Sequence, residues 1–227
     1  RDDDVIAIEG DQGDRLAEIR GKLVEHHLRP LAEPRLIKFI TGRRNKFWNK
    51  NVVALGLASG FLEPLESTSI HLIQSGVNRL LSLFPHTGIH QAEVDEYNRQ
   101  CGLEFERIRD FIILHYKATE REDSPFWRYC KNMDVPDTLQ RKMELFKANG
   151  RIFREDDELF SEESWIQVFI GQGVIPRGYD PLVDIKSKPQ IVQFLGNIHN
   201  TIKKCVDVMP THAEFVERYC KAENVAA

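Results

Sequence analysis

The stretch of sequence that decides the fold is Asn51-Val-Val-Ala-Leu-Gly-Leu-Ala-Ser-Gly-Phe-Leu-Glu-Pro-Leu-Glu-Ser-Thr-Ser-Ile70. Residues 52–57 are a compact apolar run that begins with two β-branched valines, which predicts a buried strand. The small residues at 58–60 and the proline at 64 favour a loop over residues 58–67. A strand, a loop and the start of a helix are therefore expected in direct succession.

The helix is expected to begin within a residue or two of Ser67. Ser67, Thr68 and Ser69 all have a side-chain oxygen that can accept a hydrogen bond from an unpaired amide of the first helical turn. Beyond them, apolar residues recur at helical spacing, namely Ile70, Ile73, Val77, Leu80 and Leu81.

The rest of the chain is predicted to be mainly α-helical with a few β-strands. Upstream, residues 14–29 have an amphipathic helical pattern and residues 36–40 alternate as in a short strand. Residues 151–180, rich in aromatic residues and glycine, are expected to be irregular. Downstream helical faces are predicted from Val94, Tyr97, Cys101, Phe105, Ile108, Ile112 and His115, from Leu139, Met143 and Phe146, from Ile191, Leu195, Ile198 and Ile202, and from Phe215, Val216 and Tyr219.

Composition limits the classes of function. The 227 residues carry a formal net charge of -4, which argues against a nucleic-acid-binding face. No apolar stretch approaches the roughly 20 residues of a spanning helix, so we expect no membrane contact. The first residues, Arg1 to Asp4, are charged and no apolar run follows a positive start, so we expect no signal peptide. The cysteines lack metal-site spacing, so we expect no metal and buried reduced thiols in a cytoplasmic protein, at Cys101, Cys130, Cys205 and Cys220.

Positive charge is concentrated locally in a basic cluster, which consists of Arg43, Arg44, Lys46 and Lys50. It is expected to be a solvated surface or a set of structural ion pairs, and contact with a cofactor phosphate is the alternative. No GxGxxG follows a strand in this sequence, so the nucleotide-binding fingerprint is missing from it.

The expected helix start is also the best candidate for chemistry. Unpaired first-turn amides and the helix dipole favour a small anion, so the amides of Thr68 and Ser69 are candidates to bind one. Glu66, just before the helix, is placed to orient a reactive group or accept a proton, and Glu63 offers a second carboxylate. The same residues also fit a plain helix cap with favourable electrostatics.

The stretch from Asn51 to Ile70 resembles the signature of the flavin-dependent tryptophan halogenases. Three further segments are similar to that family: Gly42-Arg-Arg-Asn-Lys-Phe-Trp-Asn-Lys50, His115-Tyr-Lys-Ala-Thr119 and Asp123-Ser-Pro-Phe-Trp-Arg-Tyr-Cys130. The resemblance runs from about residue 30 to about residue 220. It implies the carboxy-terminal part of an α/β FAD-dependent monooxygenase-like fold, without the amino-terminal FAD fingerprint.

The resemblance also implies roles for individual residues. In that family, reduced FAD and oxygen oxidise chloride or bromide to hypohalous acid, which reaches a lysine beside the substrate. Glu66 resembles the glutamate that engages the indole, and Thr68 and Ser69 resemble the pair whose amides bind the halide. Leu57 and Ile70 fall where the family contacts the flavin. The family often has glycine in place of Ser69, a mild departure because the amide binds the ion.

The motifs say less about which residues contact the substrate and which substrate is bound. Phe160 and Trp165 are expected to line the substrate site, since flat rings suit stacking on an indole, and core packing is the alternative for each. The substrate is expected to be tryptophan, another indole or a peptide. The lysine and the flavin fingerprint belong to the family's amino-terminal half, so this chain alone is expected to be inactive.

The resemblance divides the chain by role. Residues 1–70 are expected to be the last elements of the flavin-binding module with the active-site loop, and residues 71–227 a helical substrate-binding region. The intact enzyme is expected to be an FADH2-dependent halogenase acting on tryptophan or another indole. A separate flavin reductase is the expected partner, and a homodimer is allowed. The rival interpretation is a non-catalytic helical interaction module, which leaves the motif at Asn51–Ile70 unexplained.

Overall fold

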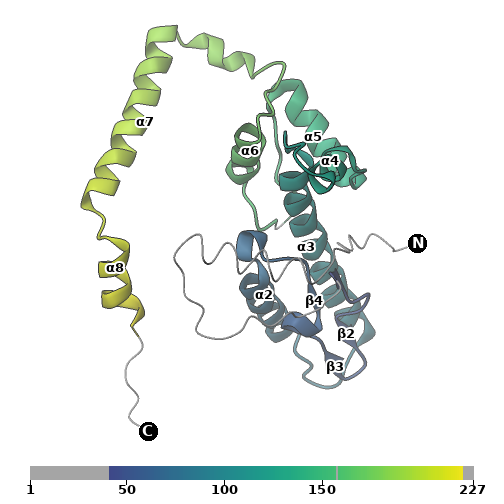
Figure 1. The fold of residues 1–227 in the computed structure, drawn as a ribbon. Coiled ribbons are helices and arrows are strands. Elements are labelled where there is room, and N and C mark those ends of the chain that lie inside the picture. Colours follow the sequence, from purple (N-terminus) through teal and green to yellow (C-terminus); the bar gives the residue numbers. More distant parts are fainter. Residues whose placement is uncertain (1–40, 157, 222–227) are drawn as a thin grey trace. The chain divides into compact units, whose positions relative to one another are not determined.

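The computed structural model describes residues 41–156 and 158–221. The chain is mostly helical with a few short strands, as predicted (Figure 1). Its contacts divide it into two compact units, Arg1–Arg177 and Gly178–Ala227. The boundary expected at residue 70, between the flavin-binding and the substrate-binding regions, concerns function rather than contacts and stays a prediction. The helix predicted at 14–29 and the strand predicted at 36–40 lie outside the described residues.

The first unit is organised around α3, the long helix Gln91–Lys117. In Figure 1, α2 (Ser69–Ser82) and the short strands lie along its amino-terminal part, while α4 (Pro125–Asn132), α5 (Asp137–Asn149) and α6 (Glu162–Gly171) surround its carboxy-terminal part. The predicted apolar face is confirmed, because six of its seven residues are buried and the last, His115, is half-buried. The six are Val94, Tyr97, Cys101, Phe105, Ile108 and Ile112.

Two hydrophobic clusters form along this helix. Near its start, Tyr97 packs edge-on against Trp48, with ring centroids 5.7 Å apart. Near its end, Phe111 and Leu114 pack against the predicted face of α5, which is confirmed as Leu139, Met143 and Phe146. Both clusters include residues of α3, so the helix is packed along most of its length.

The strands are two residues long and pair locally. β1 (Gly42–Arg43) pairs antiparallel with β4 (Gly60–Phe61), and β2 (Trp48–Asn49) pairs with β3 (Val52–Val53). The buried strand predicted at 52–57 is therefore wrong beyond Val53, and Val52 is 63% exposed. Gly56 has a φ of 59°, which breaks the extended backbone and starts the 3-10 turn η1 (Gly56–Ala58).

The pairing of β1 with β4 depends on glycine at position 60. A Cβ there would lie 2.8 Å from the Gly42 carbonyl oxygen and 2.9 Å from the Cα of Arg43. Arg43 also pairs with Glu106 at 2.7 Å, and Arg44 Nε donates to the Ala58 carbonyl oxygen at 2.9 Å. These two members of the basic cluster thus have structural partners, as one of its two interpretations expected.

The segment 58–67 is a loop that contains β4 and a second 3-10 turn, η2 (Leu65–Ser67). The helix α2 then begins at Ser69, within two residues of Ser67 as predicted. Its N-cap is Thr68, but no side chain makes a capping hydrogen bond there, so that part of the prediction is wrong.

One helix lies where the sequence predicted irregular structure. α6 occupies Glu162–Gly171, and Ser161 caps it by accepting a hydrogen bond from the Ser164 amide at 3.3 Å. Its residues Trp165 and Phe169 are buried in the cluster at the end of α3. The expectation of an irregular segment at 151–180 is therefore wrong for this helix.

The second unit consists of helical segments. These are η3 (Pro181–Ile185), α7 (Lys188–Val208), α8 (His212–Phe215) and the π-helical turn η4 (Val216–Cys220), which confirms the two helical patterns predicted here. Cys205 and Cys220 are exposed, contrary to the expectation of buried thiols, whereas Cys101 and Cys130 are buried, and all four are free.

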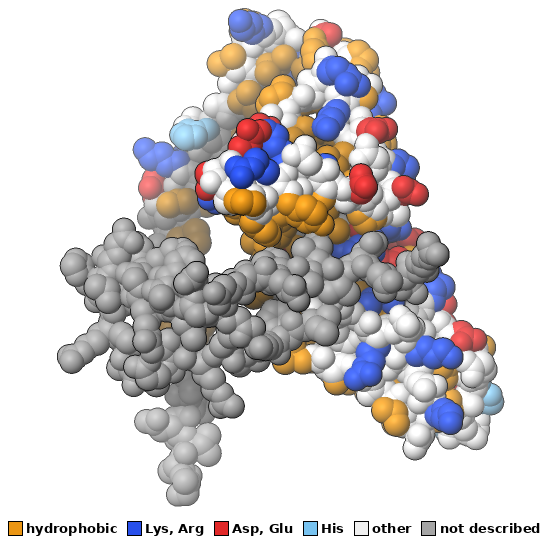
Figure 2. Space-filling view, turned by 45° about the vertical axis from the view of Figure 1, so that its right-hand side comes forward, with side chains coloured by type: hydrophobic (Ala, Val, Ile, Leu, Met, Phe, Trp, Pro, Cys, Tyr) orange, Lys and Arg blue, Asp and Glu red, His pale blue; other side chains and the backbone are white. Residues whose placement is uncertain are grey.

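Hydrophobic side chains also reach the surface in many places (Figure 2). In the described ranges, every helix is too short or too polar to span a bilayer.

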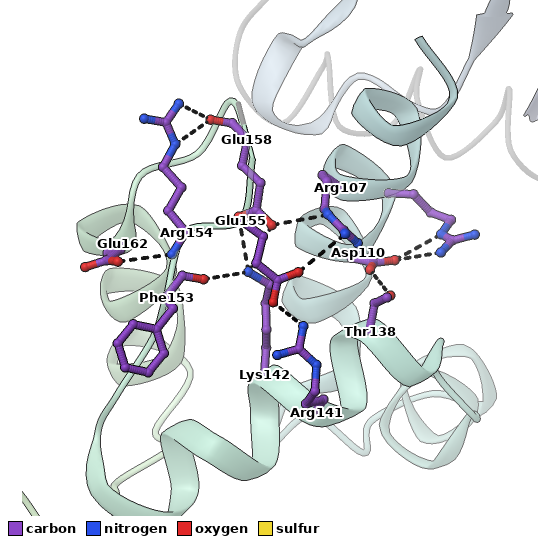
Figure 3. A network of polar contacts seen from close by, with 11 residues as sticks. Arg107, Asp110, Thr138, Arg141, Lys142, Phe153, Arg154, Glu155, Glu158 and Glu162 are labelled. Carbon is purple, nitrogen blue, oxygen red and sulfur yellow. Dashed lines mark hydrogen bonds and ion pairs between the residues drawn. The ribbon is translucent and has the colours of Figure 1, made fainter. Parts of the chain in front are cut away.

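A buried polar network joins α3, α5 and the segment before α6 (Figure 3). Lys142 Nζ lies 2.9 Å from a carboxylate oxygen of Glu158, and both side chains are almost fully buried. Arg107 of α3 lies 3.4 Å from Glu158 and 3.3 Å from Glu155. Lys142 also donates to the Phe153 carbonyl oxygen at 3.0 Å. The carboxylate of Glu158 therefore offsets the free-energy cost of burying the positive charge of Lys142.

Replacing Glu158 with glutamine is expected to destabilise the fold by about 3 kcal/mol, because Lys142 would stay buried without its counter-charge. The measurement is the free energy of unfolding in urea, followed by far-ultraviolet circular dichroism. The matched control is Glu96→Gln, which removes an exposed ion pair with Arg99 and should leave the midpoint almost unchanged. Equal effects of the two substitutions would contradict the importance of the buried pair.

Candidate active site

The loop before α2 has an unusual backbone. Glu66 has φ 63° and ψ -1°, and Ser67 has φ 51°, so two consecutive residues with side chains lie in the left-handed region. Such conformations cost about 1–3 kcal/mol each and persist only where surrounding contacts impose them. They concentrate at functional sites, which singles out this loop in the part of the chain that is described.

The carboxylate of Glu66 is held by His115 in the last turn of α3. Its Oε1 lies 3.2 Å from His115 Nε2, and the two side chains are 36% and 17% exposed. The other ring nitrogen of His115, Nδ1, lies 2.9 Å from the Phe111 carbonyl oxygen. The ring is thus fixed between its own helix and the loop. From the sequence, His115 was predicted only to lie on a helical face, and its contact with Glu66 was not predicted.

The neighbouring residue of α3 holds the loop at a second point. The Tyr116 hydroxyl donates to Glu63 Oε2 at 2.6 Å, and the Tyr116 ring stacks on Trp127 with centroids 6.1 Å apart. Burial, followed by the hydrogen bond to Glu63, raises the pKa of Tyr116, so the phenol remains a donor at ordinary pH. Glu63, considered above as a second acid, therefore anchors the loop.

The first turn of α2 has amides without helical partners. The first hydrogen bond along this helix runs from the Leu72 amide to the Thr68 carbonyl oxygen, at 3.0 Å. The amides of the first turn of α2, which begins at Ser69, therefore have no carbonyl partner within the helix. Thr68 is only 3% exposed, whereas Ile70 in the same turn is 78% exposed, so the turn is covered on one side and open on the other. This arrangement suits a small anion of the kind expected from the sequence.

A buried glutamate fixes α2 against α3. Glu104 of α3 accepts hydrogen bonds from three residues on one face of α2: His71 at 2.9 Å, Ser75 at 2.9 Å and Arg79. The Glu104 side chain is only 6% exposed. These bonds set the position of the α2 amino terminus relative to the last turn of α3, where His115 lies.

The two predicted wall residues meet at Phe111 rather than at Glu66. Phe160 stacks on Phe111 at 3.8 Å between centroids, and Trp165 lies edge-on to it at 4.9 Å. His115 packs edge-on against the same ring at 5.0 Å. Trp165 is 1% exposed, which favours the core alternative for it, whereas Phe160 is partly buried. Substrate contact stays a prediction for both residues.

The two predicted flavin contacts are highly exposed. Leu57 in η1 is 75% exposed and Ile70 in the first turn of α2 is 78% exposed. The two elements contact each other, since a Cβ on Gly56 would lie 3.4 Å from the Ile73 side chain. Two large apolar side chains on contacting elements are thus left without cover by the described residues. No group of metal ligands occurs in this part of the chain.

The tryptophan halogenase family model matches residues 16–188. The chain is similar to Xcc4156, a flavin-dependent halogenase from Xanthomonas campestris, with 48% identity and a TM-score of 0.86 over 94% of this chain and 43% of that one. It is similar to BrvH, a flavin-dependent halogenase from Brevundimonas sp. BAL3, with 47% identity and a TM-score of 0.80 over 86% of this chain and 40% of that one.

A further relative is tryptophan 6-halogenase ThaL from Streptomyces albogriseolus, 32% identical over 187 residues, which are 76% of this chain and 35% of ThaL. The chain therefore spans less than half the length of these relatives. Its mostly helical architecture matches part of the flavin halogenase fold. Because the family model covers most of the sequence and the fold agrees, the chain belongs to the tryptophan halogenase family.

Proposed function

We propose that this chain is the substrate-side portion of an FADH2-dependent halogenase that chlorinates or brominates tryptophan or another indole. The observation that carries the proposal is the left-handed Glu66, directly before the amides of α2 and in contact with His115. The activity is proposed for the intact protein, because the chain spans less than half the length of its relatives. A separate reductase would supply the reduced flavin.

Reduced FAD fits the loop by its chemistry. Leu57 and Ile70 present exposed apolar side chains beside the candidate anion site, and a flat, largely apolar ring system would cover them. When bound, reduced FAD and oxygen supply the oxidising equivalent that turns a halide into an electrophilic halogen. The chain's own residues then hold the halide, orient the substrate and receive its proton.

Glu66 is proposed as the proton acceptor for the indole. Electrophilic halogen adds to a ring carbon, and that carbon must lose its proton for the ring to regain aromaticity. A carboxylate held in a fixed conformation is well suited to take that proton, because its position does not depend on side-chain freedom alone. The left-handed backbone and the His115 contact provide that fixation.

Thr68 and Ser69 are proposed to bind chloride or bromide through their amides. The positive end of the α2 dipole adds to the attraction. Glu66 is also negative, so a halide lying against its carboxylate would be repelled. The contact with His115 holds that carboxylate toward α3, which keeps the two negative charges apart.

Phe160 is the more accessible of the two proposed substrate-wall residues. It is partly buried and stacks on Phe111, whereas Trp165 lies within the core. Trp165 would then act on the substrate only by supporting Phe111 and, through it, Phe160 and His115.

In the intact protein, Glu66→Gln is expected to keep the fold and the flavin affinity but lower halogenation by about 10² to 10⁴, because the amide cannot accept the proton. Halogenated indole is quantified by mass spectrometry, with reductase, FAD and bromide supplied. The control Glu144→Gln changes an exposed glutamate of α5 and should leave turnover unchanged. Near-normal turnover of Glu66→Gln would refute the assigned role.

Crystals of the intact protein soaked in bromide are expected to show an anomalous peak at the amides of Thr68 and Ser69. Ser69→Gly should be tolerated and Thr68→Ala should be mild, because neither removes an amide. Ser69→Pro should abolish the peak, because proline lacks the donor. A fully occupied bromide elsewhere in the site, with none at these amides, would rule out the assignment.

A further inference from the structure

We propose that His115 takes the proton from Glu66 during halogenation and releases it to water in an adjacent pocket. The inference rests on the proposed function and goes further, since it assigns a positioning residue that acts on the reaction through Glu66. Among the described residues, His115 is the side chain in contact with the Glu66 carboxylate.

The hydrogen-bond partners of His115 assign its tautomer. Nδ1 lies 2.9 Å from the Phe111 carbonyl oxygen, which can only accept, so Nδ1 must carry a hydrogen. In the neutral ring, Nε2 then has a lone pair instead of a hydrogen. That lone pair points at Glu66 Oε1, 3.2 Å away. A single proton, on either the Glu66 carboxyl group or Nε2, therefore completes a hydrogen bond between the two side chains.

This geometry prepares the pair to receive one proton. With the proton on the Glu66 carboxyl group, its O–H donates to Nε2. With the proton on Nε2, the ring is an imidazolium that donates to the carboxylate. In the first arrangement the hydrogen bond joins two neutral groups, and in the second it joins an imidazolium to a carboxylate and is charge-assisted. The pair is thus better prepared to accept a proton than a lone carboxylate in the same place.

The step balances without any further reactant. The electron pair of the ring C–H bond returns to the indole ring, and the proton moves to a carboxylate oxygen of Glu66. It is then transferred to His115 Nε2. Loss of that proton to water regenerates the neutral ring and the carboxylate. No oxidant or reductant is involved, because the halogen was already oxidised.

An open pocket of about 600 Å³ gives the proton a way out. Its lining includes His115, Thr119, Trp127, Gly171 and Gly173. A Cβ on either glycine would meet no atom within 4 Å, so this wall is open. The His115 side chain is 17% exposed, so water can reach the ring. His115 therefore both contacts the loop carboxylate and lines a solvent-accessible pocket.

The competing explanation is that His115 only holds Glu66 in place. Two variants of the intact protein separate the explanations. His115→Gln keeps a side-chain amide able to donate to Glu66 but cannot carry a proton. Tyr116→Phe loosens the same loop at Glu63 without removing the imidazole. A purely structural role predicts the same kinetic behaviour for both variants.

The test compares turnover of indole with turnover of ring-deuterated indole, in separate reactions supplied with reductase, FAD and bromide. His115→Gln is expected to lower the rate by about 10- to 100-fold and to raise the deuterium isotope effect above that of the wild type, because a carboxylate without the imidazole takes the ring proton more slowly and C–H cleavage becomes limiting. Tyr116→Phe is expected to lower the rate without changing the isotope effect.

Chemical rescue gives a second measurement. Through the open pocket, imidazole should restore turnover to His115→Ala, whereas pyrazole, of similar shape but much weaker basicity, should not. Equal rescue by both compounds, or an unchanged isotope effect in His115→Gln, would overturn the proton transfer while leaving the halogenase function intact. Absence of halogenation by the wild type with every substrate offered would overturn the proposed function, and this inference with it.

A third measurement does not depend on activity. Selective ¹⁵N-histidine labelling of the intact protein is expected to show the His115 hydrogen on Nδ1, with the Nε2 resonance shifting in Glu66→Gln. A hydrogen on Nε2 with a bare Nδ1 would overturn the proposal.

Discussion

The conformation of the active-site loop depends on two contacts made by consecutive residues at the end of one helix. His115 holds the carboxylate of Glu66, and Tyr116 holds that of Glu63. Two left-handed residues in a row are unfavourable by themselves, so the loop needs such contacts to keep its shape. If either contact is lost, the carboxylate of Glu66 is no longer held in place against the end of α3.

These two contacts keep their geometry because α3 is packed along most of its length. The cluster around Tyr97 and Trp48 holds its first half, and the cluster around Phe111 holds its second half. Glu104 ties the helix to α2, and Arg107 ties it to the network around Lys142 and Glu158. The hydrophobic core and the buried charges thus fix α3, and through its last turn they set the geometry of the loop with Glu63 and Glu66.

Much of this fold follows from local patterns in the sequence. The start of α2, the buried face of α3 and the face of α5 were predicted correctly, because helical periodicity depends only on nearby residues. The strand at 52–57 failed at Gly56, whose left-handed φ turns the chain. The helix α6 was missed although Ser161, Glu162 and Glu163 form a recognisable helix start.

The site was only partly predictable for the same reason. Glu66, Thr68 and Ser69 are neighbours in sequence, so their proximity follows from a loop and a helix start. The contact of Glu66 with His115 joins residues from separate elements, and no local pattern indicates it. The left-handed backbone of Glu66 was equally hidden, because the residue itself does not favour it.

If Glu66 is held in place to act on an aromatic substrate, a crystal structure of the intact protein with a bound indole will show where the substrate reacts. We expect the reacting edge of the indole within about 3–3.5 Å of a Glu66 carboxylate oxygen. We also expect Glu66 to keep its positive φ and its contact with His115. An indole bound away from Glu66, or a Glu66 with ordinary backbone angles and no His115 contact, would show that Glu66 does not have this role.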